Sequence, residues 1–211
     1  MLQAIDFQLG PLQTNCYLVT DQKKAIVIDP GGDPASVLRY MERNGLEPVV
    51  ILNTHIHFDH IMGNRALQQA LNLSILASPE DDSLYQAQVK GGGASMGLPE
   101  VESFEYEALY PGEKNWLDEE CHVLSTPGHT PGGLSFHFPS SGKLFSGDLV
   151  FAGSVGRTDF AGGSMEQLLS AVKEKVFTLP DSTVIYPGHG PETTVGEEKR
   201  SNPFFRSGAF L

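Results

Sequence analysis

The densest group of metal-binding side chains in the sequence follows the short apolar run Pro48–Leu52, which predicts a buried strand. Directly after it, three histidines and one aspartate lie within six residues: His55, His57, Asp59 and His60. Because alternate residues of an extended segment share a face, the first two histidines can point to one side, and a turn at Phe58 brings the other two ligands round the opposite side. Imidazole and carboxylate are ligands that Zn²⁺ and other first-row divalent metals accept. The spacing therefore predicts a metal site.

Three further turns each carry a candidate ligand just after a predicted strand. The strands and the ligands that follow them are His122–Ser125 with His129, Lys143–Phe145 with Asp148, and Thr183–Tyr186 with His189. In layered α/β folds, ligands gather beyond one end of the strands. Taken alone, each of these residues also fits a plain turn residue or cap, and Asp59 also fits a cap for a helix that starts near Ile61. Taken together, the four turns predict one shared site.

The rest of the chain alternates between strand and helix patterns. Apolar alternation predicts strands at Gln3–Leu9, Cys16–Thr20, Ala25–Ile28, Ser74–Ala77 and Leu134–Phe138. Helices are expected between an N-cap at Asp33 with Pro34 as first helical residue and a final Gly45, through Leu67 and Leu71, after the cap Ser78, and from the capping box at Ser164. Residues 90–118 break this rhythm and predict a long loop, either a lid or a disordered excursion, whose aromatic residues favour some packing.

Length and composition limit the class of protein. A chain of 211 residues fits one domain over residues 1–211, and a hydrophobic content of 40% is typical of a globular protein. No apolar run approaches the ~20 residues of a membrane-spanning helix, and Met1–Asp6 lacks the features of a signal peptide. Cys16 and Cys121 form no C-x-x-C pair, which predicts two reduced thiols. We therefore expect a cytoplasmic protein without a membrane partner.

The charge balance disfavours a nucleic-acid partner. The chain has 14 Lys plus Arg against 26 Asp plus Glu, and its formal net charge is −12. No run of basic residues offsets this charge, so the chain would repel a polyanion. A nuclease is disfavoured for this reason, and we expect a small-molecule substrate.

Taken in order, the ligand motifs resemble those of the metallo-β-lactamase superfamily. These motifs are H-x-H-x-D-H at His55–His60, P-G-H-T-P-G at Pro127–Gly132, G-D at Gly147-Asp148 and G-H-G at Gly188–Gly190. The resemblance implies a four-layer αβ/βα sandwich of the metallo-β-lactamase type and two metal ions. It also implies that one ion is bound by His55, His57 and His129, the second by Asp59, His60 and His189, and that Asp148 bridges both.

Other segments resemble the glyoxalase II-like branch of that family, the hydroxyacylglutathione hydrolases, and its short members in particular. These segments are Gly10–Tyr17, Gly153–Phe160, Thr194–Lys199 and Asn202–Phe204. The sequence ends soon after His189, so the C-terminal helical domain that supplies many glutathione contacts in long glyoxalase II is expected to be missing. This resemblance implies hydrolysis of a thioester, namely S-lactoylglutathione or a related hydroxyacylglutathione.

The chemistry expected of such a site uses two divalent metal ions, Zn²⁺ first, with Fe²⁺ and Mn²⁺ suited to the same ligands. Water shared by two metals becomes hydroxide near neutral pH and attacks the thioester carbonyl, while a metal stabilises the oxyanion. Asp59 is expected to orient this water besides ligating. Arg157 is the candidate partner for a substrate carboxylate, with a structural role in its glycine-rich loop as the alternative. Asp29 is either a partner of a ligating histidine or a turn residue.

Two other functions stay open at the level of sequence. Persulfide dioxygenases, oxidoreductases with one Fe²⁺ bound by two histidines and an aspartate, resemble this chain around Gly156–Phe160 and keep most of the other ligand positions. Seven ligands therefore do not prove two metals. A metal-binding or regulatory module that has lost activity is the non-enzymatic alternative, and the complete ligand set disfavours it.

Overall fold

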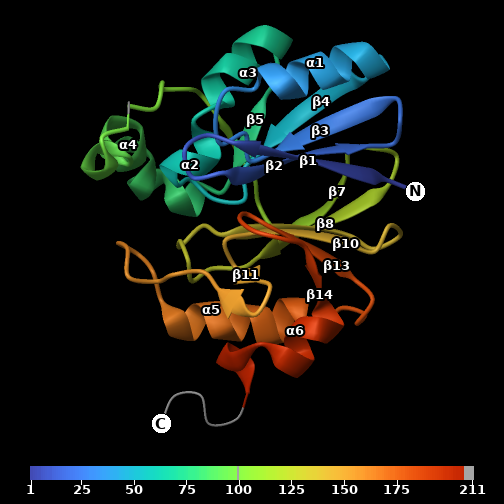
Figure 1. The fold of residues 1–211 in the computed structure, drawn as a ribbon, viewed down its shortest axis with the longest axis vertical. Coiled ribbons are helices and arrows are strands. Elements are labelled where there is room, and N and C mark those ends of the chain that lie inside the picture. The colour runs from blue at the N-terminus through green and yellow to red at the C-terminus, as the bar shows by residue number, and fades with distance from the viewer. Residues whose placement is uncertain (99, 207–211) are drawn as a thin grey trace.

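Figure 1 shows the chain as four layers in the order helices, sheet, sheet, helices. The computed structural model describes residues 1–98 and 100–206. The two sheets have six strands each, in the orders β1-β2-β3-β4-β5-β6 and β14-β13-β10-β9-β8-β7. This arrangement is the αβ/βα sandwich expected from the sequence. The domain expected over residues 1–211 also includes residue 99 and residues 207–211, which lie outside the described residues.

The first sheet is built from strands that precede residue 109. Its strands are β1 (Gln3–Leu9), β2 (Thr14–Thr20), β3 (Lys24–Ile28), β4 (Glu47–Leu52), β5 (Ile75–Ala77) and β6 (Glu107–Ala108). The helices between them are α1 (Ala35–Asn44), α2 (Phe58–Ile61), α3 (Asn64–Leu71), η1 (Pro79–Asp81), α4 (Asp82–Gly91) and η2 (Ala94–Met96). Because β3, β4, β5 and β6 pair in parallel, their carboxyl ends lie at the same edge of the sheet.

The second sheet is built from the remainder of the chain. Its strands are β7 (Gly112–Asn115), β8 (Glu120–Ser125), β9 (Leu134–Phe138), β10 (Lys143–Gly147), β13 (Val184–Pro187) and β14 (Thr193–Thr194), with a separate hairpin of β11 (Val150–Phe151) and β12 (Ser154–Val155). The helical segments are α5 (Met165–Ala171), the π-helical turn η3 (Val172–Val176), α6 (Val195–Ser201) and η4 (Pro203–Phe205). Parallel pairing of β10 with β13 brings their carboxyl ends side by side.

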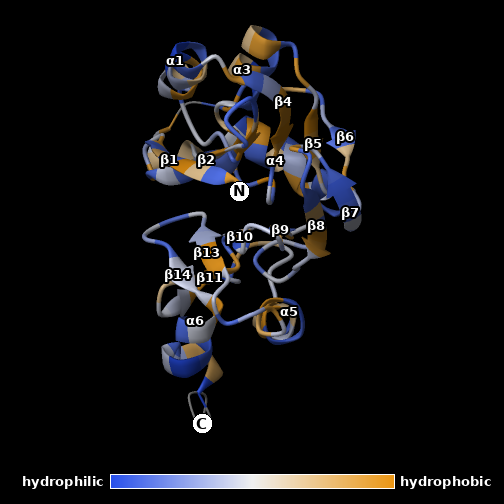
Figure 2. Ribbon diagram, turned by 90° about the vertical axis from the view of Figure 1, so that its right-hand side faces the viewer, coloured by the Kyte–Doolittle hydropathy of each residue, from blue (hydrophilic) through white to orange (hydrophobic). Residues whose placement is uncertain are grey.

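Three apolar cores hold the four layers together. The first includes Leu18 and Val27 of the first sheet with Val37, Met41 and Leu67 of its helices. The second includes the facing residues of the two sheets Tyr17, Ile28, Leu52, Phe136 and Phe145. The third includes Leu144 and Ile185 of the second sheet with Leu168, Val172 and Val176. Figure 2 shows hydrophobic residues along β4, β5 and β8, in contrast to the hydrophilic β7. Within the described ranges, no helix has the length and apolar character needed to cross a membrane.

Outside residues 90–118, the predicted strands and helices are present in the structure, and some of their ends are shifted. The strands Gln3–Leu9 and Leu134–Phe138 have the predicted bounds, and Gly45 ends α1 with a left-handed φ of 61°. The start of α1 was predicted one residue too early. Pro34 is the residue before the helix, and the Asp33 carboxylate accepts a hydrogen bond from the Ala35 amide instead of capping a helix that begins at Pro34. Ser164 caps α5 as expected, accepting from the amide of Gln167.

Residues 90–118 are not one long loop, so that prediction is wrong. The segment contains η2 and then two strands, of which β6 pairs with β5 in the first sheet and β7 pairs with β8 in the second. It is therefore the connection that carries the chain from one sheet to the other. The expected packing of its aromatic residues is confirmed at Phe104, which is buried and lies edge-to-face with Tyr85.

His137 in β9 is buried, although the alternation of the strand suggested a polar face. It pairs in register with Leu144 of the third core on one side and with His122 of β8 on the other. The reason is that both faces of the second sheet are covered in a four-layer sandwich. Burial, together with the neighbouring imidazole of His122, lowers the pKa of His137 to about 4.

His137 is expected to make the protein sensitive to mild acid. An imidazole in the unfolded chain titrates near 6.5, so the stability that depends on a neutral His137 is present above about pH 6.5 and is lost as the pH falls toward 4. The free energy of unfolding of the parent protein should decrease between pH 7 and about 4.5. We expect this decrease to be about 1–2 kcal/mol smaller in His137→Gln, a value reduced for solvent screening. Urea unfolding of both proteins at the two pH values measures this difference. Equal losses in the two proteins would contradict the prediction.

Candidate metal centre

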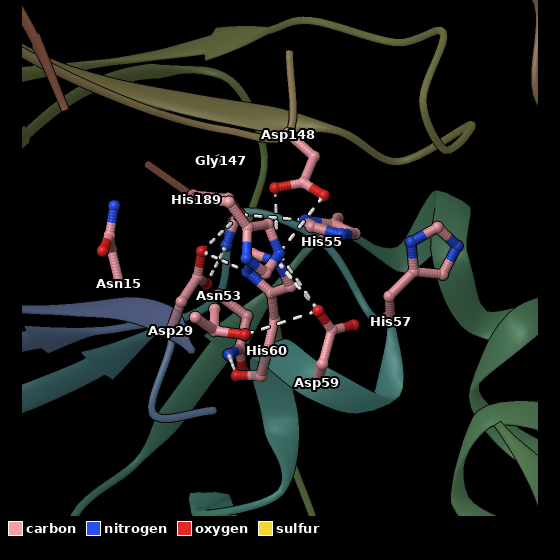
Figure 3. Close-up of polar contacts among 12 residues, drawn as sticks. Asn15, Asp29, Asn53, His55, His57, Asp59, His60, Gly147, Asp148 and His189 are labelled. Carbon is pink, nitrogen blue, oxygen red and sulfur yellow. Dashed lines mark hydrogen bonds and ion pairs between the residues drawn. The ribbon is translucent and has the colours of Figure 1, made fainter. Parts of the chain in front are cut away.

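All seven predicted ligands lie just beyond the ends of strands, at one edge of the two sheets. The segment after β4 carries His55, His57, Asp59 and His60, the loop between β8 and β9 carries His129, and Asp148 and His189 follow β10 and β13. The structure brings these residues together from both sheets. Figure 3 shows Asp148 on one side of the site, facing His55, His60 and Asp59 on the other.

His55, His57 and His129 form a cluster that we call the three-histidine group. One ring nitrogen of each lies within 4.8 Å of the others, and the Nδ1 of His57 is 2.8 Å from the Nε2 of His129. Burial lowers the pKa of His55 well below its ordinary range and that of His57 to about 3, and the neighbouring imidazoles add to both shifts. These two rings are therefore neutral at pH 7, which is the form that binds a divalent metal.

Asp59, His60 and His189 form a second cluster, the aspartate group, whose ligand atoms also lie within 4.8 Å of one another. The Oδ2 of Asp59 is 3.2 Å from the Nε2 of His189 and 3.7 Å from the Nε2 of His60. Burial acts to raise the pKa of Asp59, but His60 and His189 outweigh it and hold that pKa below its usual value. The carboxylate is thus anionic at neutral pH, as a metal ligand must be.

Asp148 lies between the two groups. Its Oδ1 is 3.3 Å from the Nε2 of His60, and its Oδ2 is 3.5 Å from the Nε2 of His129 and 3.7 Å from the Nε2 of His189. Burial acts to raise the pKa of Asp148, but the three imidazoles hold it far below its usual range. One carboxylate therefore faces both groups with a full negative charge.

The alternative role of Asp59 as a helix cap does not fit the structure. Helix α2 begins at Phe58, so Asp59 lies inside its first turn, and the helix has no side-chain cap. The Asp59 carboxylate instead accepts a hydrogen bond from the Thr14 hydroxyl at 3.4 Å and contacts His189. Its side chain points into the site rather than toward its own backbone.

Three buried atoms of the site make no hydrogen bond among the described residues, although the last two lie 3.3 Å apart: His55 Nε2, His60 Nε2 and Asp148 Oδ1. Buried polar atoms in folded proteins are almost always paired, because an unpaired one loses its interaction with water and gains nothing in return. All three are nitrogen or oxygen atoms of the kind that coordinate first-row divalent metals. The donor set therefore fits divalent metal ions.

Asp29 is a partner of a candidate ligand, as one of its two interpretations predicted. Its Oδ2 is 2.9 Å from the Nδ1 of His60, and its two oxygens accept hydrogen bonds from the amide and hydroxyl of Thr54. The contact with Nδ1 leaves the Nε2 of His60 directed at the site. A carboxylate in this position orients a ligating imidazole and increases its basicity.

The segment that carries four of the candidate ligands is held by side chains from three other elements. Its alternate amides at residues 54, 56 and 58 donate to the side chains of Asp29, Asp81 and Gln88, respectively. The sequence predicted a helix after the cap Ser78 but gave neither Asp81 nor Gln88 a role in the site. The signal that could have found Asp81 is its position just after β5, the parallel neighbour of β4.

The turn around His189 is fixed by the first sheet. The side-chain amide of Asn15 donates to the carbonyl oxygens of Pro187 and Gly190, and its backbone amide donates to Gly188. A Cβ at Gly188 would lie 2.1 Å from the Oδ1 of Asp148, so only glycine permits this close approach. These contacts explain why β2 carries polar residues at the edge next to the site.

A cavity of about 710 Å³ opens onto the ligands. Its lining includes five of them, His57, Asp59, His129, Asp148 and His189, together with Gly92 and Met96 from the connection between the sheets. The large apolar side chains of Leu12, Met96 and Phe160 also line it and are 39%, 51% and 47% exposed. The cavity therefore has a polar, charged wall of candidate ligands and apolar side chains open to solvent.

Arg157 lines the cavity but already has a carboxylate partner. Its Nε and Nη2 donate to the two oxygens of Asp159 at 2.7 and 2.6 Å, and its guanidinium lies 4.1 Å from the centre of the Phe160 ring. Its backbone oxygen is 2.7 Å from the Nδ1 of His129 and so orients that ring. The residue thus has a structural contact with a candidate ligand as well as an exposed charge at the cavity.

Buried imidazole and carboxylate groups from the two sheets together define a site for divalent metal ions. The chain belongs to the metallo-β-lactamase superfamily, whose family model matches residues 9–189.

Individual relatives agree with this class. The probable metallo-hydrolase YqgX of Bacillus subtilis is 37% identical over 199 residues, which cover 93% of this chain and 94% of that protein. Hydroxyacylglutathione hydrolase GloC of Haemophilus influenzae is 37% identical over 92% of this chain and 94% of its own length. Among solved structures, TTHA1623 in a di-iron-bound form has a TM-score of 0.87 and 39% identity, with 95% of this chain and 99% of that chain covered.

Proposed function

We propose that this metallo-hydrolase is binuclear and cleaves a thioester, S-lactoylglutathione or a related hydroxyacylglutathione. The observation that carries the binuclear proposal is the pair of ligand groups with Asp148 between them. The similarity to GloC, 37% identical over nearly the whole chain, supports the thioester as substrate. The cavity, with apolar side chains on one part of its lining and candidate ligands on another, suits a small organic substrate.

In this proposal the three-histidine group would hold one ion and the aspartate group the other, with Asp148 available to both. Divalent ions bound there would lower the pKa of water and polarise a carbonyl oxygen. Asp59 accepts a hydrogen bond from the attacking water and so orients it toward the thioester carbon. The leaving thiolate has a parent pKa of ~8.5 and needs no strong general acid.

For the metal itself we propose Zn²⁺, because neutral imidazoles and carboxylates suit it, with Fe²⁺ and Mn²⁺ as the other candidates. The di-iron form of TTHA1623 supports keeping iron among them. We also propose a cytoplasmic location, which is supported by Cys16 and Cys121, two buried free thiols. The partners we propose are the thioester substrate and no nucleic acid or membrane.

Arg157 is proposed to release the carboxylate of Asp159 and to bind a carboxylate of the substrate in its place. We expect Arg157→Met to raise KM for S-lactoylglutathione about 5- to 20-fold with little change in kcat, because an exposed charge pair contributes to binding rather than to chemistry. Steady-state kinetics on metal-replete protein measure both constants. Asp159→Asn is the matched control, since it frees the guanidinium and is expected to lower KM. An unchanged KM in Arg157→Met would contradict substrate binding by the guanidinium. The role left for Arg157 would then be the contact of its backbone oxygen with His129.

The proposed function is tested by metal analysis of anaerobically purified protein together with two assays. Two ions per chain and hydrolysis of S-lactoylglutathione would support the proposal. One iron per chain with oxygen uptake on glutathione persulfide would contradict it and favour the dioxygenase alternative. Metal-loaded protein that cleaves no thioester or ester would favour a module without activity.

A further inference from the structure

The three-histidine group is divided between two loops that are far apart in the sequence. His55 and His57 follow β4 of the first sheet, whereas His129 lies between β8 and β9 of the second. The geometry of the group therefore depends on how these two loops are held against each other. A backbone hydrogen bond from the Leu134 amide to the Thr54 oxygen, 2.7 Å, is one such link.

Asp81 is a second link between the two loops, and it contacts residues that are adjacent to the histidines in sequence. Its Oδ2 accepts from the amide of Ile56, between the first two histidines, at 3.2 Å. The same oxygen accepts from the hydroxyl of Thr130, next to His129, at 3.0 Å, and its Oδ1 accepts from the amide of Gly132 at 2.6 Å. One carboxylate thus joins both loops through three donors.

The position of Asp81 is itself fixed. It is fully buried, and it ends η1, the short helix that Ser78 caps after β5. Because β5 is the parallel neighbour of β4, Asp81 and the histidine segment leave the sheet side by side. On the other side, a Cβ at Gly132 would lie 2.6 Å from the Cγ of Asp81, so glycine is required for this approach.

We propose that Asp81 is a positioning residue that holds the three-histidine group in the geometry that binds a metal ion. This inference rests on the proposed function, because that group must bind an ion for its geometry to matter. Asp81 has no contact with the ligand atoms themselves and acts through Ile56, Thr130 and Gly132. Substitution of a residue that holds the ligands of a metal in place typically changes the affinity for that metal about 10- to 100-fold.

Asp81→Asn is the sharpest test, since asparagine keeps the size of the side chain. Its NH₂ group would face an N–H or O–H donor, so at least one of the three hydrogen bonds is lost. We expect one of two ions to bind about 10- to 100-fold more weakly and the other to be unaffected. Titration of metal-free protein with Co²⁺, followed by its visible absorption and by calorimetry, separates the two ions without any assay of activity.

Glu198→Gln is the matched control, because it changes a buried carboxylate outside the candidate metal centre. Glu198 is 1% exposed and also accepts three hydrogen bonds. The donors are the backbone amide of Gly153, the side-chain amide of Asn202 and the hydroxyl of Thr193. We expect this variant to lose comparable thermal stability but to bind both ions as the parent does. Thr130→Val, which keeps Asp81 and removes one donor, is expected to weaken the same ion by a smaller factor. It replaces Asp81→Asn if that variant does not fold.

Binding of both ions by Asp81→Asn with parental affinity, or an equal loss in Asp81→Asn and Glu198→Gln, would overturn the inference. A parent chain that binds no metal would overturn both the inference and the proposed function. If the parent binds a single ion, the binuclear proposal fails, and the role of Asp81 is supported only if Asp81→Asn weakens that ion.

Discussion

Asp148→Ala is expected to reduce kcat/KM for S-lactoylglutathione by about 10³-fold or more, which corresponds to about 4 kcal/mol of transition-state stabilisation. The reason is that its two oxygens face His60, His129 and His189, members of both ligand groups, so that removing them weakens both metal positions together. The metal content should fall below two ions per chain at the same time. Kinetics with and without added metal, together with elemental analysis, measure the two effects.

The control for Asp148→Ala is Asp181→Ala, which removes an exposed carboxylate paired with Lys199 outside the site. We expect that protein to keep both its metal content and its activity. Two bound ions and turnover within tenfold of the parent in Asp148→Ala would show that the carboxylate is not shared between the ions.

The parts of this site that could be predicted are those whose signals are local in sequence. Apolar alternation gave Gln3–Leu9 and Leu134–Phe138 with correct bounds, and the tendency of ligands to gather beyond one end of the strands brought together the residues after β4, β10 and β13. The unusual spacing of His55 to His60 supplied the chemistry. Short strands with little or no apolar alternation gave no such signal: β6 has only two residues and β7 has no apolar one, which is why both were missed within residues 90–118.

Contacts that depend on tertiary packing were not predictable in the same way. Asp81 follows a serine cap and a proline, and that pattern is explained fully by a helix start, so nothing local indicates its contacts with Ile56 and Thr130. The pairing of Arg157 with Asp159 depends equally on the path of an irregular loop. The burial of His137 was equally hard to predict, because alternation distinguishes the two faces of a strand but does not show whether a second layer covers them.

Asp59→Asn separates two roles that the proposed function gives to one carboxylate. Its Oδ2 lies 3.2 Å from the Nε2 of His189, another candidate ligand of the second ion, and Asp59 lines the cavity proposed for the substrate. Asparagine keeps an oxygen that can still coordinate a metal but lacks the negative charge that orients the attacking water. We therefore expect kcat to fall about 10²-fold in protein saturated with metal, the cost typical of a misplaced reacting group.

Two measurements distinguish these roles: kcat at saturating metal, and the affinity for the second ion. If Asp59 only coordinates, added metal should restore kcat to the parental value, and the proposed orientation of water would be wrong. Thr14→Val is the matched control, because it removes the hydroxyl that donates to Asp59 at 3.4 Å and leaves the carboxylate in place. A decrease of less than tenfold in that variant, beside a large one in Asp59→Asn, would assign the effect to the charge of Asp59 itself.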